Sequence, residues 1–179
     1  MKKLVKLAGI IVLVAVIGFT TACASIPKGA EESDLAPDAS SAVIYFLQPT
    51  WMSSGGDIII WDGENPVGKI PGGLYMNVAY KARPGTHYFM AKRFNWSSVR
   101  VDVSANNVYY INLGWAPNPI PFSNAFVILD VMTQADGLEQ FNKNEKTIVF
   151  TEAWREEFKS SLSEAALAEM RENLNAARN

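Results

Sequence analysis

Short apolar runs separated by turn residues fill the middle of this 179-residue chain and constrain its fold more than any other feature. Residues 42–48 are almost continuously apolar, as in a fully buried strand, whereas residues 99–103 alternate apolar and charged side chains, as in a strand with one buried face. Asp62 with Gly63, and Pro84 with Gly85, are typical of tight turns. We expect strands at residues 42–48, 57–61, 67–70, 74–80, 87–94, 99–103, 108–115, 125–132, 138–141 and 147–150.

Strands of this length, separated by turns at this spacing, predict a mainly β fold, an antiparallel β-sandwich over residues 41–150. Asp136 and Gly137 predict one more hairpin, into residues 138–141. This region contains no cysteine, so its stability depends on a hydrophobic core rather than on disulfides.

Residues 151–179 predict a long C-terminal amphipathic helix. Thr151 is a favourable N-cap and Glu152 places an acid in the first turn. At 100° per residue the apolar side chains of the two halves fall on different faces, so one straight face cannot be buried throughout. We expect the first half to dock on the sheet and the rest to bend near Ser160 and Ser161, to project as a plain surface helix, or to meet a partner. The candidate partner face consists of Leu167, Met170 and Leu174.

The chain begins with three lysines and an uncharged apolar run at residues 7–19, which is too short to cross a bilayer. This pattern predicts a signal peptide at residues 1–22, ending before Cys23, the only cysteine. An uncleaved membrane anchor is the alternative. The segment Thr20-Thr21-Ala22-Cys23 resembles the lipobox of bacterial lipoproteins, although that family usually has Leu where Thr20 stands.

The lipoprotein resemblance implies that Cys23 becomes the mature N-terminus and carries diacylglycerol and an acyl chain, which together give stable anchoring. Ala24 after the cysteine, rather than Asp, implies the outer membrane. We expect Cys23 and the Ala-, Ser- and Pro-rich residues that follow, 23–40, to form a flexible tether. Removal of the leader takes three of the sixteen basic residues and leaves a net charge of about −5, which argues against nucleic acid as a partner.

A second resemblance lies in the β-rich region. The strand end at residues 45–49, the Asp62-Gly63 hairpin and the turn at residues 83–87 resemble a bacterial lipoprotein domain family of unknown function, and the two turns are similar to PEGA-type surface modules. The likeness covers about residues 42–115 and implies a β-rich fold without known catalytic residues.

The sequence offers little for catalysis. His87 is the only histidine, which removes most Ser-His-Asp arrangements and every multi-histidine metal site, and we expect it to be structural. Asp57, Asp62 and Glu64 surround one hairpin, but Asp62 suits the turn itself and the spacing matches no calcium loop. We therefore expect no enzyme activity, no metal and no cofactor.

Aromatic residues in or beside the expected loops form the remaining candidate site. It consists of Trp51, Trp96, Trp115 and Phe94. If these loops share one end of the domain, the rings can stack on a sugar or contact a protein; the alternative is that they plug the core. The sequence thus predicts a lipid-anchored cell-envelope protein, facing the periplasm, that acts as a non-enzymatic binding or assembly module for an envelope protein. A carbohydrate- or peptidoglycan-binding module is the alternative.

Overall fold

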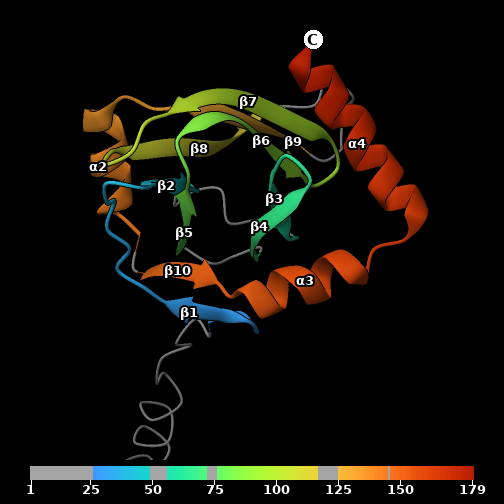
Figure 1. Cartoon of the computed structure of the whole chain (residues 1–179), viewed down its shortest axis with the longest axis horizontal. Helices are drawn as coiled ribbons and strands as arrows, with labels where there is room; N and C mark the ends of the chain where they lie inside the picture. The colour runs from blue at the N-terminus through green and yellow to red at the C-terminus, as the bar shows by residue number, and fades with distance from the viewer. Residues whose placement is uncertain (1–25, 49–55, 72–75, 117–124, 145) are drawn as a thin grey trace, which may run out of the picture.

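The computed structural model describes residues 26–48, 56–71, 76–116, 125–144 and 146–179, and within these ranges the protein is mainly β, with two sheets and three helices (Figure 1). The strands are β1 (Ala30–Glu32), β2 (Ala42–Leu47), β3 (Ile58–Asp62), β4 (Asn65–Ile70), β5 (Met76–Ala82), β6 (Gly85–Lys92), β7 (Trp96–Val103), β8 (Val108–Ala116), β9 (Phe126–Val131) and β10 (Lys146–Phe150). The helices are α2 (Gln134–Phe141), α3 (Glu152–Ser160) and α4 (Glu164–Arg178).

The larger sheet has the order β1-β10-β5-β2-β8-β9 and the smaller one the order β4-β3-β6-β7. The smaller sheet is antiparallel, but β10 pairs with β5, and β2 with β8, in parallel. The predicted antiparallel arrangement therefore holds for the smaller sheet, whereas the larger sheet is mixed. The strands of each parallel pair are far apart in the chain, since β3 to β7 lie between β2 and β8, and β6 to β9 with α2 lie between β5 and β10. Such long connections permit parallel pairing.

One hydrophobic core takes side chains from both sheets. Ile44 and Phe46 of β2 point into it, and the Phe46 ring meets Phe89 of β6 edge-on, with 5.3 Å between centroids. Val43 and Tyr45, on the opposite face of β2, pack in a second cluster with Phe141 of α2. The continuous apolar run thus predicted a strand buried on both faces, and this prediction is confirmed.

The hairpin expected at Asp136 and Gly137 is wrong, because these residues lie in α2. Thr133 caps this helix by accepting a hydrogen bond from the Asp136 amide at 3.2 Å. Gly137 lies against the Tyr110 ring, where a Cβ would come within 2.3 Å of ring atoms. An Asp-Gly pair is compatible with a turn or with a first helical turn, and here the cap and the close helix–sheet approach favour the helix.

The described part of the expected tether is ordered rather than flexible. Ala30 pairs with Phe150 across β1 and β10, Ile26 packs against the core, and the backbone oxygen of Leu35 accepts a hydrogen bond from Tyr45 at 3.0 Å. Described residues ahead of the expected boundary at residue 41 are therefore part of the fold. Composition misled the prediction because pairing at a sheet edge uses backbone groups, which any residue supplies.

The C-terminal region forms two helices rather than one. Thr151 caps α3 as predicted, and Ser163 caps α4 by accepting a hydrogen bond from the Ala166 amide at 3.2 Å. Helix α4 runs along the outer face of the smaller sheet, where Met170 and Leu174 are each only 1% exposed. Leu167 packs on the same cluster. The candidate partner face of Leu167, Met170 and Leu174 is thus covered by the protein's own sheet, and this prediction is corrected.

Candidate functional site

Trp96 contacts α4 and does not join Phe94 and Trp115 in one patch. Its Nε1 donates a hydrogen bond to Glu169 Oε1 at 2.8 Å, and Lys92 Nζ forms an ion pair with the same oxygen. Lys92, followed by Trp96, lowers the pKa of Glu169 below its usual range. The ring itself packs with the side chains under α4. Trp96 therefore helps to dock the helix.

Phe94 and Trp115 do come together, through the guanidinium of Arg93, which precedes Phe94 in the chain. The Arg93 guanidinium lies 4.7 Å from the centroid of the Phe94 ring and 4.2 Å from that of Trp115. Trp115 is partly buried against the core, whereas Phe94 is 51% exposed. We call this arrangement of Arg93, Phe94 and Trp115 the Arg93 stack. The Lys92-Arg93-Phe94 run was the available signal, since cations beside aromatic residues favour cation–π contacts.

The turn that carries the Arg93 stack is fastened to β9. Asn95 Nδ2 donates to the Val127 carbonyl at 2.9 Å, and the Val127 amide donates to Asn95 Oδ1 at 2.8 Å. Partial burial lowers the pKa of Arg93 from its very high ordinary value, which leaves the guanidinium charged at neutral pH. The stack thus presents an apolar ring beside a held cation, an arrangement suited to aromatic, apolar or sugar surfaces.

The predicted aromatic patch is only partly assembled. Phe94 and Trp115 belong to the Arg93 stack, Trp96 belongs to the α4 contact, and Trp51 lies outside the described residues, as does Cys23. Trp96 and Trp115 pack on different hydrophobic clusters, so these two rings do not share one surface.

A second polar cluster joins three strands. Asp62 Oδ2 accepts a hydrogen bond from Tyr80 at 3.0 Å and lies within hydrogen-bond distance of His87 Nδ1, at 2.8 Å. The other ring nitrogen of His87 lies 2.8 Å from the Arg83 carbonyl, which can only accept. The His87 ring also stacks on Phe89, 5.5 Å between centroids. Because both ring nitrogens are engaged, His87 serves the fold, and Tyr80 is the member that sequence reasoning missed.

The three acids around the first hairpin have separate partners. Asp57 pairs with Lys69 and Glu64 with Arg171, each at 3.2 Å, while Asp62 belongs to the cluster just described. In the described ranges no group of three or more histidine or acidic residues is arranged to hold a metal ion.

A polar cavity of about 480 Å³ lies between β1, β10 and the end of α2. Asn144 Nδ2 donates to Asn77 Oδ1 at 2.6 Å, and Asn77 Nδ2 donates to the Phe141 carbonyl at 3.2 Å. These bonds connect the segment after α2 to β5, so the two amides act as internal links between elements.

No protein-family model, no curated protein and no solved structure matches this chain. Among the described residues, no helix has the length and apolarity needed to cross a membrane. The resemblances to the lipobox and to PEGA-type modules therefore stay predictions from the sequence.

Proposed function

We propose that this protein is a lipid-anchored cell-envelope protein, attached through Cys23 to the outer membrane and facing the periplasm, that acts as a non-enzymatic binding or assembly module. In this proposal the two sheets form a β-sandwich scaffold that presents the Arg93 stack to an envelope partner. The exposed Phe94 ring, supported by Arg93 and Trp115, is the observation that carries it.

The composition of the stack supports a binding role. Arginine and large aromatic residues are enriched at protein interfaces and dominate their binding energy. Two hydrogen bonds between Asn95 and Val127 fasten the turn to β9, so little loop entropy remains to be lost when a partner binds.

The partners of His87 and of the three acids around the first hairpin support the non-enzymatic part of the proposal. His87 has no free ring nitrogen to act as a base, and Asp57, Asp62 and Glu64 are each paired. General acid–base chemistry requires a group that can reach a substrate, and His87 and Asp62 are turned to internal partners, whereas Asp57 and Glu64 form surface ion pairs.

A photo-crosslinking amino acid at Phe94 tests the proposal in native membranes. Leu138 on α2 is the matched control position, because it is also apolar and also 51% exposed. We expect a discrete protein adduct from position 94 that is absent from position 138 and is reduced in Cys23→Ser, which lacks the anchor. The same adducts from both positions, or none from position 94, would contradict this role of the stack.

A glycan partner is the second candidate, since an exposed aromatic ring also suits a sugar face. Sedimentation of the protein with purified peptidoglycan distinguishes the two. If glycan is the ligand, the wild type sediments and Phe94→Ala stays in solution, whereas a protein partner predicts the crosslink without co-sedimentation.

A further inference from the structure

The chain enters the domain beside α3. The amide of Thr151, the cap of α3, donates a hydrogen bond to the Gly29 carbonyl at 3.0 Å, and β1 continues along β10. Gly29 lies so close to Trp154 that a Cβ would come within 2.4 Å of its ring. Figure 1 shows β1, β10 and α3 together at one end of the molecule, which we call the entry end.

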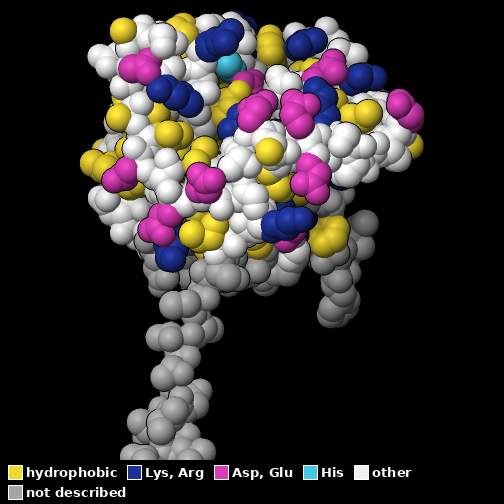
Figure 2. Space-filling model, turned by 60° about the horizontal axis from the view of Figure 1, so that its bottom comes forward, with side chains coloured by type: hydrophobic (Ala, Val, Ile, Leu, Met, Phe, Trp, Pro, Cys, Tyr) yellow, Lys and Arg dark blue, Asp and Glu magenta, His cyan; other side chains and the backbone are white. Residues whose placement is uncertain are grey.

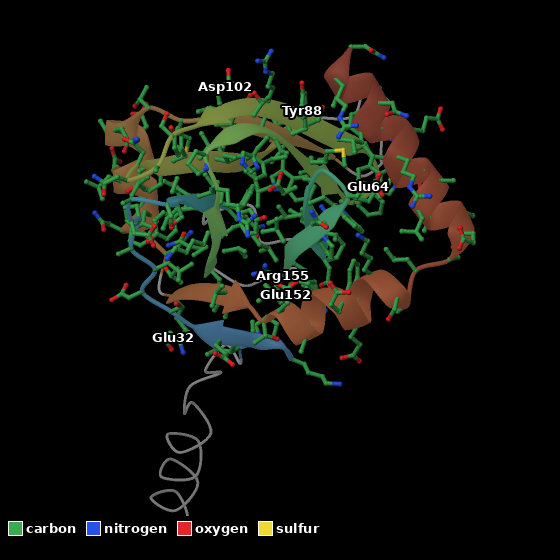
Figure 3. All side chains as sticks on the ribbon, viewed as in Figure 1. Glu32, Glu64, Tyr88, Asp102, Glu152 and Arg155 are labelled. Carbon is green, nitrogen blue, oxygen red and sulfur yellow. The ribbon has the colours of Figure 1, made fainter. Side chains whose placement is uncertain are left out.

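The opposite end carries the last residues of β7. In Figure 3, Glu32 of β1 and Glu152 of α3 lie at the entry end, whereas Asp102 of β7 lies across the body of the protein. A residue at the entry end is therefore nearer to the point where the chain enters the domain than a residue at the Asp102 end of β7.

The connection between Cys23 and the ordered domain is very short. Ile26 already packs against the core, and only three peptide units separate it from Cys23. Consecutive Cα atoms are 3.8 Å apart, so this connection spans at most about 11 Å whatever its conformation. A domain joined to its anchor in this way cannot move far from the lipid.

We propose that the entry end, formed by β1 and α3, lies against the headgroups of the bilayer and that the Asp102 end of β7 points away from it. This inference rests on the proposed lipid anchor at Cys23. A flexible tether over residues 23–40 would let the domain take any orientation, whereas this proposal fixes one orientation at the lipid surface.

The surface of the entry end suits the headgroup region. Trp154 and Phe158 stack with 5.0 Å between centroids and line a cavity of about 350 Å³ that is also bordered by Lys28 and Lys69. Aromatic rings beside lysines are typical of membrane interfaces, where the rings lie at headgroup level and the lysines reach to water.

Charge does not supply the attachment. Figure 2, which brings the entry end forward, shows acidic and basic side chains interspersed. The acids of β1 and α3 are Glu31, Glu32, Glu152, Glu156 and Glu157. Only Lys159 and Arg155 oppose them within these two elements. The acyl chains and the short connection therefore hold the entry end at the surface, and the bilayer it suits best is zwitterionic.

Single spin labels test this orientation on the full lipidated protein. Cys23 is the only native cysteine and its sulfur carries the lipid, so Glu156→Cys on α3 and Ser104→Cys just after β7 each supply one free thiol. Both positions are exposed. Among the hydrogen bonds and ion pairs described, none uses the side chain of Glu156 or of Ser104; the bond from Ser104 to Tyr109 comes from its backbone amide. The labelled proteins are bound to phosphatidylcholine vesicles that contain a nickel-chelating lipid.

We expect the nickel headgroups to relax the label at position 156 severalfold more strongly than the label at position 104. A twelve-residue Gly/Ser insert between Ser25 and Ile26 should remove this difference, because it lifts the limit on the distance. Equal relaxation at both positions in the protein of native length overturns the orientation. A difference that persists with the insert overturns the role of the short connection.

Vesicle flotation separates this inference from the anchor on which it rests. The lipidated wild type should float with the vesicles and Cys23→Ser should not. If the wild type does not float, or if Cys23→Ser floats equally, the proposed anchor is wrong and the inference fails with it. Flotation that depends on Cys23, with equal relaxation of the two labels, refutes the orientation alone.

Discussion

Asp62 joins three strands from a single carboxylate oxygen. Tyr80 of β5 belongs to the larger sheet, whereas Asp62 of β3 and His87 of β6 belong to the smaller one, so the cluster links the two sheets. Burial, followed by the nearby Asp62 charge, raises the pKa of Tyr80 well above its usual range, which keeps the hydroxyl as a donor. Hydrogen bonds to a charged, largely buried acceptor are among the stronger ones in a protein.

Asp62→Asn should therefore lower the free energy of unfolding by about 1.5–3 kcal/mol, and Tyr80→Phe by about 1 kcal/mol. Urea denaturation of the unlipidated Cys23→Ser protein measures both. Thr86→Ala is the matched control, because Thr86 also donates to a carboxylate, that of Asp102, but on the exposed surface. Its effect should stay within about 0.5 kcal/mol. Equal effects at Asp62 and Thr86 would show that the cluster does not link the sheets.

At the scale of the element, α4 is held by apolar burial and by one shared carboxylate. Met170 and Leu174 fill the cluster with Trp61 and Met90, and Glu169 joins Lys92 and Trp96. The folded-state pKa of Glu169 is lowered, so its contribution to stability is present above the unfolded-state pKa and is lost as the pH falls through the folded-state value.

Glu169→Gln should consequently destabilise the protein near neutral pH and have progressively less effect as the solution is acidified below the normal glutamate range. The measurement is the unfolding midpoint of wild type and variant across an acid pH series. Glu172→Gln, on an exposed face of α4, serves as the control for loss of a helix charge. A Glu169→Gln effect that does not change with pH would refute the role of the charged form.

Apolar burial should contribute more to the docking of α4 than the carboxylate does. Leu174→Ala should cost about 2–5 kcal/mol in unfolding free energy, because it leaves a cavity in a side-chain cluster that is almost fully buried. Ala168→Ser on the exposed side of α4 should be nearly neutral. Chemical denaturation measures both, and a loss below about 1 kcal/mol at Leu174 would mean that α4 is only loosely attached.

Helix α2 depends on a glycine at its contact with the sheet. Gly137→Ala should gain about 1 kcal/mol in helix propensity and lose about 1–3 kcal/mol through collision with the Tyr110 ring, so we expect a net loss. Thermal unfolding measures the balance. Ala135→Gly is the control within the same helix, where lost propensity acts without any clash. A net gain for Gly137→Ala would mean that α2 shifts easily on the sheet.

At the scale of the whole molecule, the predicted acylation of Cys23 should be the sole membrane attachment. Without the predicted leader, residues 23–179 carry a net charge of about −5, so residual electrostatic binding to anionic membranes is not expected. Cys23→Ser should appear entirely in the soluble fraction of cells, at low as well as high salt, while mass spectrometry of the wild type finds acyl chains on residue 23. A membrane-bound Cys23→Ser protein that salt releases would point to an attachment through the folded domain.

Local sequence patterns predicted most of the strands and the cap of α3. Apolar runs and turn residues act over a few neighbours, which is why β2, the Asp62-Gly63 hairpin and the Thr151 cap agree with the structure. Ser160 and Ser161 also lie close to the observed break, although the cap that begins α4 is Ser163. Among the candidate site residues, Phe94 and Trp115 were identified from the sequence, but the stacking of Arg93 between their rings was not predicted.

What the sequence by itself determined was most of the succession of elements, with the exceptions of β1 and α2, because strand alternation, turns and caps depend on adjacent residues. The tertiary structure alone decided which aromatic rings are available: Trp96 is bound by Glu169, 73 residues away, and Phe94 is left exposed. It also decided that β1 joins β10, more than a hundred residues later in the chain. Contacts between such distant residues depend on how whole sheets and helices pack, and no local pattern records them.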